Sequence, residues 1–166
     1  MIPLVPHPST PEDAFGVAAG VEREASGTLR FAYRVVGALE DVRVAPSGRA
    51  DRLWEHTCFE AFVVVEGEAG YVELNIAPSG EWAVYGFARY RERSAVAVDA
   101  VPSVEVARGA ESLDVVATLP FGAAAVRVGL TAVVERTDGR RSYWALRHPA
   151  RAPDFHHADG FVIRLP

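Results

Sequence analysis

The sequence predicts an all-β fold, an antiparallel β-sandwich of the immunoglobulin-like or jelly-roll-like kind with very little helix. Short stretches alternate polar and apolar residues, breaker residues separate them at regular intervals, and apolar residues at helical spacing are almost missing. A chain of 166 residues with 49% hydrophobic content is long enough for one well-packed core and short for two. Residues 1–166 are therefore expected to form a single domain.

Residues 1–20 are expected to be an N-terminal arm in which a short helix can form. Four prolines interrupt residues 1–11. Thr10, Pro11, Glu12 and Asp13 then supply a hydroxyl cap, a proline at the first helical position and acids in the first turn. Gly16 and Gly20 lie in the next ten residues, so any helix here should be short.

The first half of the chain then predicts five strands. In residues 28–36, arginines alternate with Leu29, Phe31, Tyr33 and Val35, as in a half-buried strand. Residues 57–66 are apolar on both faces apart from Glu60, which predicts a central strand. The five predicted strands are 28–36, 41–44 (closed by the breakers Pro46, Ser47 and Gly48), 57–66, 71–77 and 81–90.

The second half continues in the same style, without an internal repeat. The predicted strands are 103–107, 112–119, 126–136, 142–147 and 161–165. The Asp138-Gly139 pair suits a type I′ hairpin turn between two of them. Residues 148–160 are expected to be an irregular loop.

Charge and composition exclude several classes of protein. The net charge of −5 and the pI near 5.5 argue against nucleic-acid binding. Arg89, Arg91 and Arg93 form the densest basic run, but Glu92 interrupts it, and a solvated strand end or turn is the simpler interpretation. The lone Cys58 lies in an apolar strand and is expected to be a buried, inert thiol.

The sequence also contains no apolar stretch long enough to cross a bilayer. Its first residues lack the apolar run with basic flanks that is typical of a secretory signal. A soluble, cytoplasmic protein without a membrane partner is expected, and the oligomeric state stays open.

Polar side chains gather in two stretches, 53–60 and 71–82, both of which are expected to be extended. If Glu66 faces Tyr71 across the turn at 67–70, the side-chain period of two puts Glu60, Glu73 and Asn75 on one face. Buried carboxylates need partners, because an unpaired buried charge is costly. The partner is either a ligand or an internal arginine, for which Arg34, Arg127 and Arg147 are the candidates.

The tryptophans favour a sugar as the ligand. Trp54, Trp82 and Trp144 each stand beside acids, histidine or arginine. Flat indole faces stack on the C–H faces of sugar rings, while nearby polar groups bind the hydroxyls. Packing in the core or at its rim is the alternative for each tryptophan.

A metal site is a second candidate. His148, Asp154, His156 and His157 lie close in sequence, and imidazole with carboxylate is a plausible ligand set for zinc. No strong ligand spacing is present, so a latch is favoured in which Asp154 caps the loop and Phe155 is buried in the core. Serine-type catalysis is disfavoured because the Gly-x-Ser-x-Gly motif is missing.

Three blocks of sequence carry a resemblance to a known family. They are Leu53 to Phe62 (LWEHTCFEAF), Tyr71 to Trp82 (YVELNIAPSGEW), and Ser142 to Pro149 (SYWALRHP) with Pro153 to His156 (PDFH). They resemble the signature blocks of the bacterial DOMON-like proteins, which are similar to the type 9 carbohydrate-binding modules. The resemblance covers most of the chain and implies a β-sandwich with a pocket for a sugar or a haem.

The residues help to choose between these two ligands. Haem-binding relatives use methionine and histidine as axial ligands, and the only methionine here is Met1. A haem held by His56 together with His148 or His156 stays as an alternative. Sugar-binding relatives are expected to hold the ring between two tryptophans, while acids, asparagine and arginine bind its hydroxyls.

The leading hypothesis is therefore a non-catalytic domain that binds a small molecule, a carbohydrate or a sugar-containing metabolite, without cofactor or metal. Alternatives from other classes are a metal-dependent hydrolase or isomerase built on His56, His148, His156 and the acids, and a structural partner module. The expected ligand-binding residues are Trp54, Glu55, His56, Glu60, Glu73, Asn75, Trp82, Trp144, Arg147 and His148.

Overall fold

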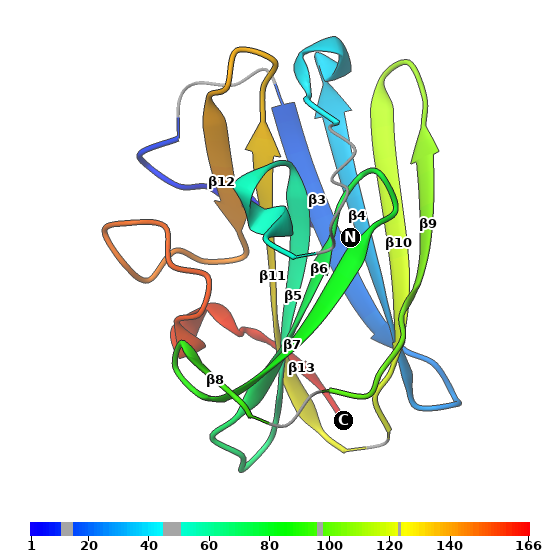
Figure 1. Cartoon of the computed structure of the whole chain (residues 1–166), viewed down its shortest axis with the longest axis vertical. Coiled ribbons are helices and arrows are strands. Elements are labelled where there is room, and N and C mark those ends of the chain that lie inside the picture. Colours follow the sequence, from blue (N-terminus) through cyan, green and yellow to red (C-terminus); the bar gives the residue numbers. More distant parts are fainter. Residues whose placement is uncertain (11–14, 45–50, 96–97, 123) are drawn as a thin grey trace.

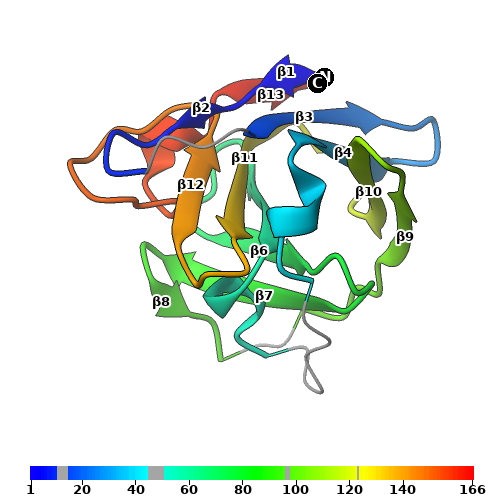
Figure 2. The same cartoon turned by 90° about the horizontal axis from the view of Figure 1, so that it is seen from above.

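The structure, a computed structural model, describes residues 1–10, 15–44, 51–95, 98–122 and 124–166. Two antiparallel sheets face each other in it (Figure 1, Figure 2). Within those ranges helical structure is limited to three 3₁₀ turns, η1 (Leu39–Asp41), η2 (Leu53–Glu55) and η3 (Ala158–Gly160). The predicted all-β antiparallel sandwich with very little helix is confirmed. No helix of the described chain has the length and apolar character needed to cross a membrane.

The first sheet has five strands in the order β1-β3-β4-β10-β9. They are β1 (Ile2–Pro3), β3 (Phe15–Arg23), β4 (Thr28–Gly37), β9 (Ser103–Arg108) and β10 (Ser112–Pro120). As the alternating pattern predicts, Leu29, Phe31, Tyr33 and Val35 of β4 are buried in the core. The hydroxyl of Tyr33 donates a 2.7 Å hydrogen bond to the Glu60 carbonyl, which ties this sheet to the second one.

The second sheet has the order β2-β12-β11-β5-β6-β7-β8, and β13 also pairs with β11. Its strands are β2 (Val5–Pro6), β5 (Cys58–Val65), β6 (Tyr71–Ile76), β7 (Trp82–Arg89), β8 (Glu92–Arg93), β11 (Val126–Glu135), β12 (Arg141–Ala145) and β13 (Ile163–Leu165). The predicted central strand is confirmed, because β5 lies between β11 and β6 and is buried on both faces.

Both faces of the second sheet are covered. One face packs on the first sheet through residues such as Phe59 and Leu74. The outer face carries a separate apolar cluster made of Phe62, Val64, Tyr71, Phe87 and Phe161. Beside it, Cys58 is fully buried with Leu53, which confirms the buried thiol. The covering elements are η2 and the segment after β12, which run past this face (Figure 1).

The N-terminal region differs from the prediction. Residues 15–20, expected to lie in an arm with a short helix, belong to the strand β3, whose side chains alternate between buried and half-buried positions up to Gly20. Small residues make this alternation weak in the sequence, and the two glycines lie on the face that is less buried. The predicted helix start at Thr10 to Asp13 falls mostly on residues 11–14, which lie outside the described residues.

Two further local predictions are wrong. Residues 41–44 are not a strand, since η1 ends at Asp41 and only Val42 forms a bridge, with Arg136; the breakers at 46–48 lie outside the described residues. The turn before β12 is not type I′, because Gly139 (φ +86°) has a positive φ and Asp138 does not. Gly139 N–H donates to the Arg136 carbonyl, as in a type I turn followed by a glycine bulge.

Candidate functional site

The candidate site begins with three polar side chains on the outer face of β5 and β6. Glu60 pairs with Asn75 across the two strands and Phe62 pairs with Glu73, so Glu60, Glu73 and Asn75 share this face. The hairpin register differs by two residues from the predicted one, since Val63 lies opposite Val72. A shift of two leaves every side chain on the same face, so the parity argument holds.

These three side chains are almost fully buried. Relative exposure is 3% for Glu60, 5% for Glu73 and 0% for Asn75. Asn75 Nδ2 donates a 2.7 Å hydrogen bond to Glu73 Oε1, and Thr131 Oγ1 donates to Glu60 Oε2 at 3.3 Å. Neither glutamate has an arginine within ion-pair distance in the described ranges. The expected internal partners are absent there, and Arg34 pairs with Asp114 on the other sheet.

Burial changes the protonation of both acids. The pKa of the Glu60 carboxyl is raised well above 4.5 by burial and by the charge of Glu73, while the Thr131 hydrogen bond opposes the shift. Burial also raises the pKa of Glu73, against the effect of Asn75 and of Arg93 and Arg91. Two carboxyl groups that disfavour each other's charge retain a proton more readily than isolated ones. The pair can therefore offer both a donor and an acceptor to a ligand.

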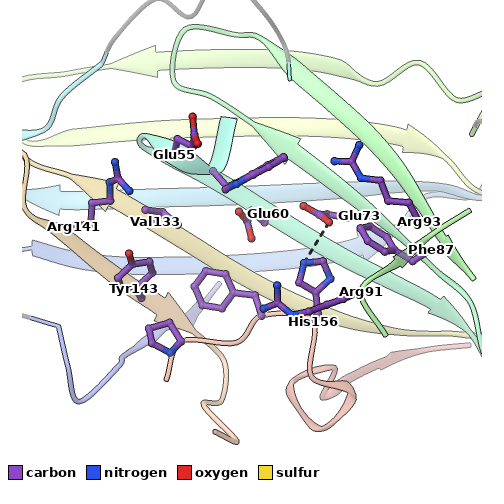
Figure 3. A pocket seen from close by; sticks show the side chains of 13 residues that line it. Glu55, Glu60, Glu73, Phe87, Arg91, Arg93, Val133, Arg141, Tyr143 and His156 are labelled. Atoms are coloured by element: carbon purple, nitrogen blue, oxygen red, sulfur yellow. Dashed lines mark ion pairs between the residues drawn. The ribbon is translucent and has the colours of Figure 1, made fainter. Parts of the chain in front are cut away.

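His156 faces Glu73, with 3.8 Å between Nε2 and Glu73 Oε2 (dashed line in Figure 3). The Tyr71 hydroxyl accepts the Arg91 backbone N–H at 3.1 Å, and we assign its own proton to the 2.7 Å hydrogen bond with His156 Nδ1. The ring proton then sits on Nε2. Burial and the nearby Arg91 guanidinium lower the pKa of His156 from its usual 6.5 to about 4. His156 is thus a neutral donor directed toward Glu73.

A cavity of about 680 Å³ opens above these acids. Its aromatic lining consists of Trp54 from η2, Phe87 from β7, Tyr143 from β12 and Phe155 from the segment after β12. Tyr143 and Arg141 lie to one side of the Glu60 carboxyl in Figure 3, and Arg93 lies on the other. The remaining lining residues are Glu55, Glu60, Glu73, Arg91, Val133, Pro153 and His156. The cavity combines an acidic floor with aromatic and arginine walls.

The basic run corrects one interpretation of the sequence. Arg89 is exposed and pairs with Glu92 at 2.6 Å, as expected of a solvated strand end. Arg91 and Arg93 instead line the cavity. Arg91 adopts φ +54°, and its guanidinium pairs with Asp154 at 2.9 Å. The sequence shows that Arg91 and Arg93 alternate with Glu92, but it does not show that these two arginines face the cavity.

The latch predicted at residues 153–157 is confirmed for Asp154, which caps the segment. Asp154 Oδ1 accepts the His156 backbone N–H at 3.2 Å, and Oδ2 accepts the Tyr90 hydroxyl at 2.8 Å. Hydrogen bonds from Tyr90 and Arg91 outweigh burial and lower the pKa of Asp154. Phe155 is half-buried against the outer cluster and also lines the cavity, so it is not the core residue that was expected. No three His, Cys, Asp or Glu residues of the described ranges lie close enough to hold a metal.

Four of the expected binding residues line the cavity. Trp54, Glu55, Glu60 and Glu73 do so, and Asn75 lies behind them as the donor to Glu73. Trp54 and Glu55 reach the cavity from η2 and not from an extended strand, so the expectation for residues 53–55 was wrong. Glu55 forms an ion pair with Arg52 at the rim.

The other two tryptophans lie on the opposite face of the sheet. Trp82 pairs with Ile76 across β6 and β7, and Ile76 is in the core between the sheets. Trp144 is in the same core, 5% exposed, with its Nε1 donating to Ser142 Oγ at 2.9 Å. Paired residues project from the same face. Neither can form a tryptophan pair with Trp54, and the alternative of core or rim packing holds for both.

Three more expected residues lie outside the cavity lining. His56 Nδ1 is 2.8 Å from Glu135 Oε2, on the side of the sheet near β12. His148 Nε2 is 2.8 Å from the Val5 carbonyl, and its ring centre is 6.4 Å from that of Phe155, with the two rings tilted. Arg147 is exposed. The three histidines considered as haem ligands contact different elements. His56 contacts Glu135 of β11, His148 contacts Val5 of β2, and His156 contacts Tyr71 of β6.

Sequence reasoning assigned no binding role to seven lining residues: Phe87, Arg91, Arg93, Val133, Arg141, Pro153 and Phe155. It considered His156 only as a ligand of a metal or a haem, and Tyr143 only as part of the segment 143–148 opposite the acids. One signal was available. Tyr143 and Arg141 alternate with Ser142 and Trp144, so assigning Trp144 to the core would have turned both toward the outer face.

Comparison with known proteins supports the fold. No protein-family profile matches the sequence, and no curated protein matches it. The structure is similar to the crystal structure of a "putative carbohydrate-binding protein" from Bacteroides uniformis, with a TM-score of 0.71 and 20% sequence identity. The match covers 96% of this chain and 83% of that one. The chain therefore has the β-sandwich fold of that protein over nearly its whole length.

Proposed function

We propose that the protein binds a carbohydrate or a sugar-containing metabolite in the cavity, without converting it chemically. The observation that carries this proposal is the pairing of buried Glu60 and Glu73 with a neutral His156 beneath aromatic walls. Sugar hydroxyls need donors and acceptors side by side, and sugar C–H faces need flat apolar surfaces. The volume of about 680 Å³ is in the usual range for small-molecule sites.

The binding mode follows from the corrected geometry. Trp54 supplies the aromatic face on one element and Phe155 on another, in place of the expected pair of tryptophans. Glu73 accepts a ligand hydroxyl while Asn75 holds its other oxygen. The His156 Nε2–H, 3.8 Å from Glu73, is close enough for one hydroxyl to bridge both groups. The similarity to the "putative carbohydrate-binding protein" of Bacteroides uniformis and the resemblance to DOMON-like proteins and type 9 modules support the same ligand class.

Calorimetric titration with a panel of monosaccharides and disaccharides tests the proposal. The wild-type protein should bind at least one of them, and Glu73→Gln should weaken that binding by about tenfold, because the amide nitrogen replaces one carboxyl oxygen and leaves a buried polar group without its partner, which costs about 1–3 kcal/mol. Gln keeps the size of Glu, so the fold is expected to persist, which circular dichroism checks.

The tryptophans provide a matched control for the same titration. Trp54→Ala should reduce affinity by about tenfold or more, because it removes the stacking surface. Trp82→Ala removes an equal side chain from the opposite face of the sheet and should leave affinity unchanged. A panel without any binding sugar, or equal losses in the two variants, contradicts the proposal.

A further inference from the structure

Arg93 lines the cavity without a carboxylate partner. The neighbouring arginines are both paired, Arg89 with Glu92 and Arg91 with Asp154. Over the described ranges, the Arg93 side chain makes no hydrogen bond or ion pair. An exposed arginine at a cavity mouth is often only solvated, so its position needs a separate argument.

The Arg93 guanidinium is held in place by aromatic rings. Its central carbon lies 3.9 Å from the centre of the Tyr85 ring and 6.0 Å from that of Trp54. Tyr85 is itself fixed, since its hydroxyl donates to Asp51 at 2.5 Å and its ring packs edge-on to Trp54. The Arg93 backbone pairs with Phe87 in the sheet. The rings cover one face of the guanidinium. Its N–H edges stay free and can donate paired hydrogen bonds to an oxyanion.

The charges in the cavity decide where an anionic group can bind. At the floor it would meet Glu60 and Glu73, two carboxyls without an arginine partner in the described chain. Arg93 lies to the side of Glu73 (Figure 3), so an anion there avoids the floor. Arg141 is a second cavity-lining arginine without a close carboxylate partner in the described chain, since its Nε is 3.9 Å from Glu135 Oε1. It lies on the far side of Glu60 in the same view.

We propose that the ligand is an acidic sugar, whose carboxylate or other oxyanion pairs with Arg93 while its hydroxyls reach Glu73 and His156. This inference rests on the proposed carbohydrate function and narrows it to one ligand class. Trp54 then has two roles, since it lines the cavity and also supports the Tyr85–Arg93 stack. The oxyanion can be a carboxylate, as in a uronic acid, or a phosphate, as in a sugar phosphate.

Matched ligands test this inference: glucose with glucuronate and glucose 6-phosphate, and galactose with galacturonate. We expect the wild-type protein to bind at least one acidic member about tenfold more tightly than its neutral counterpart, the effect of one charge-assisted contact. The preference should shrink at high salt, because Arg93 is exposed. Whether uronate or phosphate is preferred identifies the oxyanion.

Variants then assign the effect to one residue. Arg93→Gln should bring the ratio of acidic to neutral affinity close to one, and Arg93→Lys should retain part of it. Arg89→Gln removes an arginine that is paired outside the cavity and should leave the ratio unchanged.

The outcomes separate this inference from the function on which it rests. Neutral sugars that bind as tightly as acidic ones overturn the inference and leave carbohydrate binding intact. A preference that persists in Arg93→Gln but disappears in Arg141→Gln overturns the assignment to Arg93. If no sugar of either kind binds, both proposals fail.

Discussion

At the scale of single residues, the site depends on opposite pKa shifts in groups that face each other. Burial raises the pKa of Glu73 and lowers that of His156, so both are driven toward their neutral forms. Their nearest contact, between Nε2 and Oε2, is 3.8 Å long and thus beyond hydrogen-bond distance. Both groups therefore keep hydrogen-bonding capacity for a ligand.

The shift of His156 predicts how stability depends on pH. A histidine with a depressed pKa in the folded state stabilises the fold above its unfolded pKa, and this contribution is lost as the pH falls from 6.5 to about 4. His156→Asn keeps an acceptor for Tyr71 and cannot titrate. The wild-type protein should thus lose about 2 kcal/mol relative to the variant between pH 7 and pH 4, after allowance for the partial exposure of the ring.

Urea denaturation of both proteins at several pH values measures this difference. Comparison with the variant is needed because the raised pKa values of Glu60 and Glu73 act in the opposite direction, stabilising the fold at low pH and less so as the pH rises above 4.5. Parallel stability curves for the two proteins would mean that His156 protonates in the folded protein as easily as in the unfolded chain.

The sequence predicts residues of this site only as far as strand parity reaches. Glu60, Glu73 and Asn75 could be placed on one face because a period of two survives an error of two in register. The same parity separates Trp82 from Tyr85, and it would have excluded Trp82 had Ile76 been assigned to the core. His156 could not be placed, because the segment between β12 and β13 carries no period that fixes its direction. Arg93 could not be placed because β8 has only two residues, too few to show a period.

At the scale of elements, the latch is held by an aromatic side chain that packs on β11 where a glycine leaves the strand without a side chain. Phe161 stacks on Phe62, with ring centres 5.7 Å apart, and lies over Gly129. A Cβ at Gly129 would be 2.6 Å from the Phe161 ring. Phe161 follows η3 and thereby fixes the end of the segment that carries Phe155 and His156.

Gly129→Ala is predicted to displace Phe161 and to loosen the latch. The extra methyl should destabilise the fold by about 1–3 kcal/mol, as overpacking does. Thermal unfolding measures the loss, and trypsin should cut faster after the exposed Arg151. Gly109→Ala is the matched control, since its methyl would lie 3.6 Å from the nearest atom. If both variants resist trypsin like the wild-type protein, Phe161 does not hold the latch.

Elements with strong alternation could be predicted from sequence, and those with small residues could not. β4 and β6 alternate large apolar and polar side chains and were found. Residues 16–21 of β3 are all Gly, Ala or Val, and the pairing of β3 with β4 supplies the stability that its own sequence does not signal. η2 begins after Arg52, whose positive φ of 64° turns the chain out of the extended state that the aromatic residues suggested.

At the scale of the whole molecule, the N-terminal segment joins the two sheets. β1 pairs with β3 in the first sheet, and β2 pairs with β12 in the second. Leu4, between them, is 4% exposed in the shared core. The largest apolar cluster draws on both sheets, so neither can bury its inner face alone.

We therefore predict that the protein unfolds in a single cooperative transition. Trp144 lies in the shared core and Trp54 at the cavity, so each reports on a different region. With Trp82 replaced by Phe, a second Trp→Phe change at 54 or at 144 leaves one indole as the probe. Urea midpoints from each single tryptophan and from far-UV circular dichroism should coincide within error, as two-state unfolding requires. If Trp54 reports an earlier transition than Trp144 does, the outer face with its cavity unfolds separately from the sandwich core, and the domain is not one cooperative unit.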